Sequence, residues 1–492
     1  MALNQPAPKN GHDGFRYMVL ADRLEALIRN GAFRAGEKLP SIRRLHTETG
    51  LSITTVYQAF MELEKRGMVN ARRKSGYYAR PLLENLLPTP KAPDSPAAPR
   101  RITVNSLAFT LCEAMSDPQV LQLGGAVIAP ELLPGKFLAA IAKSFSVQAL
   151  SRNFCSYGHT MGYAPLRRLI AQRCAHFAGR VSEDAIMITN GCVEAVSLCL
   201  RAVAQPGDTI LVESPTFPWF LQAIEDFGMY ALEVPGSAQT GMDLDTLAAV
   251  IRRHRVKACL FNANFNNPLG YLMSDDRKSA LVELMTAAGI PIIEDDINGD
   301  LFFGTARPAP LKAFDRNEMV LYCSSYSKTL SPGVRVGWTM PGRFLEKTRR
   351  FKLNAAISQP TLSQMVVAEY LRDGAYDRHL RRLRTHLQNQ VGNTAMAVAR
   401  HFPPGTRISA PKGGLILWVE MAGKIDSLEL FRRALEARIA FMPGIICAGS
   451  PVYANCLRIS CGSPFTPSVE AGIHRLAQIA RQLTSTATKA EP

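Results

Sequence analysis

Residues 320–335 read VLYCSSYSKTLSPGVR, and this stretch decides how the larger part of the chain folds. Its apolar start predicts a buried strand, after which come hydroxyl groups, Lys328 and, one short loop later, Arg335. Ligands of parallel α/β sheets bind at the carboxyl ends of the strands, so this lysine and this arginine are candidate site residues. A single lysine in such a loop is more often a surface residue. The residues at the neighbouring strand ends must therefore show whether Lys328 belongs to a binding site.

Apolar, strand-like runs alternate with helical stretches around this segment. The runs include AIMIT, TILVE, KACLFN and PIIED, and the helical stretches include VEAVSLCLRAVA and SALVELMTAAG. This alternation predicts an α/β body with a mostly parallel sheet and helices on both faces.

Three further strand ends carry polar groups. Residues 189–193, Thr-Asn-Gly-Cys-Val, lead into a helix, where free N–H groups and the helix dipole favour a phosphate. Residues 267–270, Asn-Pro-Leu-Gly, form a turn that presents an amide. Residues 294–296, Glu-Asp-Asp, place carboxylates at a buried strand end, where ionisation requires a cationic partner or a metal ion. Each pattern alone is weak or has a purely structural explanation.

Together and in this order, the four strand ends resemble those of the fold type I PLP enzymes, the aspartate aminotransferase superfamily. The resemblance covers essentially the whole body and implies pyridoxal 5'-phosphate (PLP) as cofactor, with no metal. It also implies a large domain with a mostly parallel, seven-stranded-type sheet, beside a smaller α+β domain. Lys328 would form the internal aldimine, a role for an amine of lowered pKa, and Asp295 would pair with the protonated pyridine nitrogen. These two are the candidate catalytic residues.

The same resemblance implies the remaining contacts. Asn267 would donate to the phenolic O3′ of PLP, and Phe217 would stack on the pyridine ring. Tyr157 would reach the phosphate across a homodimer interface, and Arg458, otherwise an ordinary strand-edge arginine, would grip the α-carboxylate of an amino acid. The residues expected to bind the phosphate directly are Arg335, Ser325, Ser327 and the backbone of Gly191 and Cys192.

Two positions depart from the pattern of these enzymes. Relatives usually carry a tyrosine three residues after the pyridine-pairing aspartate, where this chain has Asn298. Many also have Ser or Gln after the glycine of the phosphate loop, where this chain has Cys192 and Val193. We therefore expect PLP and an amino-acid-like ligand to bind, with weak or absent turnover.

A separate helical module precedes the body. Apolar residues at helical spacing and local stop signals predict short helices within 17–30, 41–50 and 52–67, followed by two strands around the turn at 74–76. This order is that of a winged helix-turn-helix. Residues 36–69, GEKLPSIRRLHTETGLSITTVYQAFMELEKRGMV, resemble the DNA-binding head of GntR-type bacterial regulators.

The face opposite the apolar stripe of this head carries hydroxyl, amide and guanidinium groups that suit phosphates and base edges of double-stranded DNA. The alternative is a generic three-helix module with solvated charges. The candidate DNA-binding residues are Arg43, Arg44, Ser52, Thr54, Thr55, Tyr57, Gln58, Arg72, Arg73 and Lys74.

Composition and charge agree with this division. Hydrophobic residues make up 47% of the chain and charged residues 20%, which excludes a largely disordered or fibrous protein. Residues 1–80 supply +7 of the formal net charge of +16, so the head is the expected anion-binding part. No apolar run is long enough for a membrane helix and the first residues lack the apolar core of a signal peptide, so we expect a cytoplasmic protein.

We predict four segments. Residues 1–14 form a flexible tail, 15–80 the winged head, 81–105 a Pro/Ala-rich linker and 106–492 the body, with a large part at about 156–340 and a small part at about 106–155 plus 341–492. The linker composition suits an extended, semi-rigid spacer, and an ordered loop docked on the body is the alternative.

A GntR-type head, a linker and a fold type I body in this order resemble the MocR family of bacterial regulators. The resemblance implies a homodimeric transcriptional regulator whose body senses an amino acid or amine through aldimine exchange at PLP. Two other hypotheses stay open at this point: an active PLP-dependent aminotransferase with an accessory DNA-binding head, and a body that has lost PLP and serves as a dimerisation scaffold.

Overall fold

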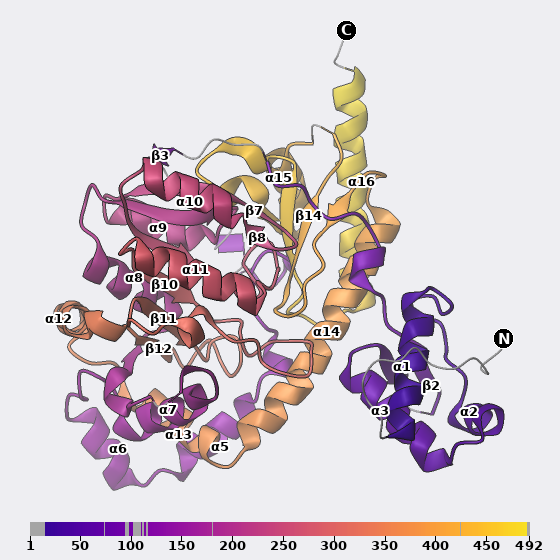
Figure 1. The fold of residues 1–492 in the computed structure, drawn as a ribbon, viewed down its shortest axis with the longest axis horizontal. Helices are drawn as coiled ribbons and strands as arrows, with labels where there is room; N and C mark the ends of the chain where they lie inside the picture. The colour runs from indigo at the N-terminus through magenta and orange to yellow at the C-terminus, as the bar shows by residue number, and fades with distance from the viewer. Residues whose placement is uncertain are drawn as a thin grey trace.

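The computed structural model describes residues 15–72, 74–93, 98–101, 110, 113–114, 117–179, 181–423 and 425–489. A small N-terminal head lies beside a larger body (Figure 1). The predicted tail at 1–14, Arg73 and parts of the linker fall outside the described residues. Within the described part of the chain, no helix is long and apolar enough to cross a membrane.

The head is a winged helix-turn-helix, which confirms that prediction. Its second and third helices start where hydroxyl side chains cap them: Ser41 Oγ accepts from Arg44 N at 3.2 Å, and Ser52 Oγ accepts from Thr55 N at 3.1 Å. Phe60 lies in its core and stacks on Tyr77 of the wing, with ring centroids 4.2 Å apart. The elements are α1(Arg16–Arg29), α2(Ile42–Thr49), α3(Ile53–Lys65), β1(Val69–Arg72) and β2(Gly76–Ala79).

The body is built on a sheet whose strand order is β3-β7-β6-β9-β10-β11-β12-β5. Neighbours from β7 to β11 are parallel, while β12 is antiparallel to both β11 and β5 and β3 is antiparallel to β7. The fold type I body is therefore confirmed, and its sheet is mixed, with parallel central strands from β7 to β11 and antiparallel pairings at both edges. Its strands are β3(Pro99–Arg100), β5(Met187–Thr189), β6(Thr209–Ser214), β7(Tyr230–Ser237), β9(Val256–Phe261), β10(Ile292–Asp295), β11(Val320–Ser325) and β12(Gly337–Met340), and β8(Gly241–Met242) pairs with β7 off this path.

Helices cover both faces of this sheet, because successive strand residues point to opposite sides. In β6, Ile210 and Val212 pack with α8(Cys192–Val203) and α9(Pro218–Asp226), whereas Leu211 packs on the side of α10(Leu244–Arg253) and α11(Asp275–Ala287). The remaining helices before the second sheet are α5(Gly135–Ser144), α6(Val147–Phe154), α7(Ala164–Ala178), α12(Leu345–Ala356), α13(Thr361–Arg372) and the long α14(Ala375–His401).

A second, four-stranded antiparallel sheet has the order β13-β14-β17-β16, and β15 pairs with β4 beside it. It packs with α14, α15 and α16 into the same hydrophobic core as α10 and α11. Its elements are β4(Leu121–Gln122), β13(Arg407–Ile408), β14(Ile416–Glu420), α15(Ser427–Glu436), β15(Ile439–Ala440), β16(Met442–Pro443), β17(Cys456–Ser460) and α16(Pro467–Lys489).

The described residues after the head lie on the body. Ile408 N donates to Pro88 O at 2.9 Å, and Lys91 N donates to Glu420 at 2.9 Å. Strand β3 extends the edge of the large sheet. Over its described residues, backbone groups and apolar side chains of this stretch find partners on the body.

The head also touches the body directly. The Arg80 guanidinium, which is buried, donates to the side-chain oxygen of Gln388 on α14. Gly67 lies against the same glutamine, and a side chain at Gly67 would overlap it. Pro81 packs close to Gly392, one turn further along α14. Small residues on both sides therefore permit a close approach of head and helix.

Candidate functional site

The carboxyl ends of β10 and β11 open into a cavity of about 200 Å³ that also borders the second sheet. The four strand ends singled out in the sequence converge here, because parallel neighbours end at the same edge of a sheet. The predicted site residues that line the cavity are Cys192, Phe217, Asn267, Asp295, Ser327, Lys328, Arg335 and Arg458, and Val193 and Asn298 line it too.

Lys328 follows β11 and turns its amine into the cavity, where it donates to Ala126 O. Burial lowers its pKa to about 8, since it disfavours the ammonium, and the positive charge of Arg458 acts in the same direction. Asp295 opposes this shift. A larger fraction of this amine is therefore neutral near physiological pH than for an ordinary lysine, although the ammonium form still predominates below about pH 8.

Asp295 is the last residue of β10 and is 6% exposed. Its Oδ1 accepts from Ile297 N at 3.0 Å and from the Cys192 thiol at 3.1 Å. Burial raises the pKa of this carboxyl to about 6. A cation or a protonated ring nitrogen beside it would stabilise the ionised form.

Arg458 lies on β17 with only 1% of its surface exposed. Its Nη1 donates to Asn267 Oδ1 at 2.6 Å and its Nη2 to Gly124 O at 2.6 Å, while its buried Nε has no partner. Burial lowers its pKa to about 10. No ion pair joins it to a carboxylate among the residues that the structure describes, so a bound anion would complete its coordination.

Arg335 marks the other end of the cavity, at the N-terminus of α8. Its Nη2 donates to Asn190 O at 2.7 Å, and a Cβ on Gly191 would lie only 2.6 Å from this nitrogen. Ser325 is buried behind the cavity, where its hydroxyl bonds Ser327 Oγ at 2.8 Å and Val336 O at 3.0 Å. Gly191 thus leaves room for the Arg335 guanidinium, and Ser325 holds the Ser327 hydroxyl in place. Gly191 and Ser325 do not line the cavity themselves.

Three other predicted positions differ in their surroundings. Phe217 lines the cavity and stacks on Trp219, with ring centroids 5.3 Å apart. Tyr157 is 83% exposed and does not line the cavity of its own chain. Asn298 uses its amide nitrogen to donate to Phe265 O at 3.2 Å, which fixes the backbone just before Asn267.

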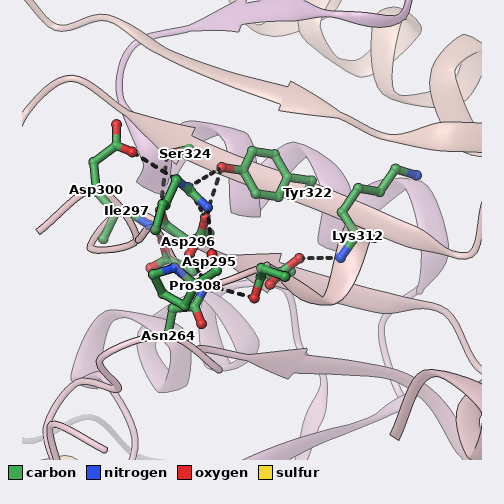
Figure 2. A network of polar contacts seen from close by, with 12 residues as sticks. Asn264, Asp295, Asp296, Ile297, Asp300, Pro308, Lys312, Tyr322 and Ser324 are labelled. Carbon is green, nitrogen blue, oxygen red and sulfur yellow. Dashed lines mark hydrogen bonds and ion pairs between the residues drawn. The ribbon is translucent and has the colours of Figure 1, made fainter. Parts of the chain in front are cut away.

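The two carboxylates beside Asp295 have separate partners (Figure 2). Glu294 accepts from the backbone N–H groups of residues 311 and 312, at 2.6 and 2.9 Å. Asp296 pairs with Arg307 at 2.5 Å and accepts from Tyr322 Oη at 3.0 Å. In the described part of the chain, no group of His, Cys, Asp and Glu side chains has the arrangement of a metal site. Each of the three acidic residues therefore has its own set of partners.

Several cavity residues escaped sequence reasoning. Asn262 donates to Asp295 O at 2.7 Å, and its position directly after the run KACLF could have revealed it. Trp219, Ile416 and Met442 also line the cavity. The last two lie on short strands of the second sheet, where no local motif marks them.

The candidate DNA face of the head is open to solvent. Arg43, Thr54 and Tyr57 are exposed, and Arg44 is exposed and pairs with Glu48 at 2.6 Å. The hydroxyls of the helix cap at Ser52 and Thr55 bond each other at 2.8 Å, and Arg72 stacks on Tyr78 at 4.1 Å from the ring centroid. Gln58 and Lys74 are exposed as well.

Comparisons with known proteins agree with this architecture. The family "Aminotransferase class I and II" matches residues 132–475, and "Bacterial regulatory proteins, gntR family" matches residues 16–78. The uncharacterized HTH-type transcriptional regulators YdcR and YjiR of Escherichia coli (strain K12) are 34% and 33% identical to this chain. The matches cover 95% of this chain and 99% of YdcR, and 94% of this chain and 98% of YjiR.

Among solved structures, the α-aminoadipate aminotransferase LysN of Thermus thermophilus is 30% identical with a TM-score of 0.72. The match covers 78% of this chain and 97% of that one. Fold, cavity and head thus define a winged-helix protein with a fold type I, aminotransferase-like body. The chain belongs to the MocR family of transcriptional regulators. PLP is the cofactor of this body, which confirms the predicted cofactor.

Proposed function

We propose that this transcriptional regulator binds operator DNA through its head and senses an amino acid or amine at the PLP site of its body. The observation that carries the proposal is the meeting of Lys328, Asp295 and Arg458 in one cavity. These three groups suit an aldehyde, a protonated ring nitrogen and a carboxylate. An amino acid whose amine takes the place of Lys328 on the cofactor would present its carboxylate to Arg458.

The residues of the cavity fit PLP in charge and position. When bound, the cofactor supplies an aldehyde that reacts with amines and a ring that withdraws electrons. Lys328 would hold the aldehyde and Asp295 the ring nitrogen, with Phe217 against the ring face. Arg335, Ser327 and the backbone at the start of α8 would hold the phosphate, since a helix N-terminus favours an anion. Asn267 accepts from Arg458 through its Oδ1, so its Nδ2 would still be able to donate to O3′, whereas the Nδ2 of Asn298 already donates to Phe265 O, which supports a weak contact of Asn298 to O3′.

A packed hydrophobic cluster joins the cavity to the head. It consists of Ile128, Leu301, Leu383, Leu387, Leu415 and Ile416. Leu415 and Ile416 line the cavity, while Leu387 precedes Gln388, the residue that Arg80 of the head contacts. Coupling between effector binding and DNA binding requires the effector to bind one arrangement of the body better than another. A contiguous packed core can transmit such a difference in arrangement from the cavity to the head.

We also propose that the protein acts as a homodimer with paired heads. Tyr157, Phe154, Val147 and Phe137 are all strongly exposed, which is costly for large apolar side chains unless another surface covers them. In a dimer, Tyr157 of the partner subunit would complete the phosphate site, and two heads would read two half-sites of operator DNA.

The alternative of an aminotransferase with an accessory head is not favoured. The relatives that match over the whole chain, head included, are transcriptional regulators by description, and the 2-aminoadipate transaminase of Thermus thermophilus matches 76% of this chain. The scaffold hypothesis is disfavoured by the buried, incompletely paired Arg458 and by the lowered pKa of Lys328, which a pure scaffold does not require.

The test measures binding of the full-length protein to an operator selected from a random-sequence DNA pool. Fluorescence anisotropy is recorded with and without PLP and with a panel of amino acids and amines. We expect PLP plus at least one amine to change DNA affinity in the wild type, and no such change in Lys328→Ala. Equal responses of the two proteins would exclude sensing through Lys328.

A further inference from the structure

The charges of the cavity are few, and each has a role in the proposed function on which this inference rests. Among the described residues that line it, the cations are Lys328, Arg335 and Arg458, and the single carboxylate is Asp295. Three of these would hold the cofactor, and Arg458 would hold the α-carboxylate of the effector. No cation or carboxylate of the described lining is left to pair with a charged effector side chain.

The cavity residues that share a face of the second sheet with Arg458 are apolar. In the second sheet, Met442 of β16 lies directly opposite Arg458, and Ile416 of β14 lies opposite Ser460, two residues along the strand. Residues opposite one another share a face of the sheet, as do residues two apart on a strand. Met442, Ile416 and Arg458 therefore project from the same face, and all three line the cavity.

Other apolar groups enclose the rest of the effector region. Val127 and Leu415 line the cavity beside the segment 124–126, whose carbonyls accept from Arg458 and Lys328. Trp219 lines it from the start of α9. An amino acid bound between Lys328 and Arg458 would thus direct its side chain into a hydrophobic enclosure.

We propose that the effector is an α-amino acid with an uncharged, largely apolar side chain. An ionised side chain would lose its hydration in this enclosure without gaining a partner, so acidic and basic amino acids are disfavoured. An amine without a carboxylate would leave the buried guanidinium of Arg458 without an anion. In a hydrophobic pocket each added methylene group favours the larger ligand by roughly tenfold or more.

The experiment titrates the full-length, PLP-bound protein with four probes and follows the absorbance of the cofactor. The probes are L-leucine, L-glutamate, L-lysine and 3-methylbutylamine, which is leucine without its carboxylate. We expect the dissociation constant of leucine to be at least about tenfold lower than that of each other probe. Glutamate, lysine or 3-methylbutylamine binding as tightly as leucine would overturn the inference.

A matched pair of variants locates the selectivity. Met442→Lys places a cation beside Arg458, and we expect it to shift the preference from leucine towards glutamate by about tenfold or more. Met442→Leu keeps the enclosure apolar and should retain the wild-type order. If the lysine variant does not fold, the order of the four probes on the wild type still decides the inference.

The outcomes separate this inference from the proposed function. A protein that takes up no PLP, or whose cofactor absorbance responds to no amine, refutes the proposed function and this inference with it. A protein that responds to amines but prefers a charged side chain refutes the inference alone. Preference for leucine supports both.

Discussion

The Cys192 thiol lies 3.1 Å from Asp295 Oδ1, so this cysteine contributes its side chain, and not only its backbone, to the site. Burial, reinforced by the neighbouring carboxylate, raises the pKa of the thiol well above its usual value. The group is therefore protonated and donates. Its hydrogen bond opposes the effect of burial on Asp295, because donation to a carboxylate favours the charged form.

Cys192→Ala should consequently raise the pKa of Asp295 above its value of about 6. At neutral pH a larger fraction of Asp295 would be protonated and unable to pair with a protonated pyridine nitrogen. We expect PLP affinity to fall about tenfold, as for loss of a hydrogen bond to a charged group. Absorbance titration with PLP between pH 5.5 and 8 measures this. Cys192→Ser retains a donor and should keep the wild-type affinity, and an unchanged PLP affinity in Cys192→Ala would exclude the role.

The lowered pKa of Lys328 gives a pH dependence with a definite sign. A pKa of about 8 means that the protonated, unreactive form dominates below that pH and the neutral amine above it. The rate at which PLP attaches to the cofactor-free protein should therefore rise with pH and level off above about 8, whereas an ordinary lysine would still gain at pH 10. Stopped-flow absorbance measures the rate, and Lys328→Ala is the control that should show no attachment at this site.

The sequence was sufficient to predict the strand ends, but not which contacts each of their side chains makes. The apolar runs before Lys328 and Asp295 place both at one edge of a parallel sheet, and this follows from periodicity alone. The hydrogen bond from the Cys192 thiol to Asp295 depends on the rotamer of Cys192. The two residues lie about 100 positions apart in the sequence. The contribution of Met442 depends on strand pairing between segments that carry no motif. Contacts of this kind arise from tertiary packing, which a local pattern does not encode.

Gly191 offers a test of the phosphate end of the cavity. Gly191→Ala introduces a Cβ 2.6 Å from Arg335 Nη2 at a backbone φ of 85°, so it combines a steric clash with backbone strain. Gly207→Ala is the matched control, because Gly207 has a φ of 88° and nothing within 4 Å of the added Cβ. Both variants should lose about 1–3 kcal/mol of unfolding free energy. Only Gly191→Ala should also weaken PLP binding, and equal PLP affinity in the two variants would contradict the role of Arg335.

The DNA face is tested by salt dependence. Arg43 and Arg44 are exposed on α2, and replacing both with alanine should remove their interactions with DNA phosphates. The logarithm of the binding constant should then depend less steeply on the logarithm of salt concentration, by about 0.9 for each phosphate that is no longer neutralised. Arg432→Ala, on the body, removes an exposed arginine that pairs with Glu429 and should leave the slope unchanged. An unchanged slope in the double variant would place the DNA face elsewhere.

Gln388 is the residue of α14 that contacts Arg80 of the head. A substitution at this position tests transmission of the signal to the head independently of cofactor binding. Gln388→Ala removes the acceptor of the Arg80 guanidinium without touching the cavity, because Gln388 does not line it. We expect PLP affinity to stay unchanged while the effect of an amine on DNA affinity shrinks several-fold, since coupling energies of about 1–3 kcal/mol are comparable to one buried hydrogen bond. Arg381→Ala, exposed on the same helix, is the control and should behave as the wild type. A Gln388→Ala protein with full amine response would show that the signal reaches the head by another route than the Arg80 contact.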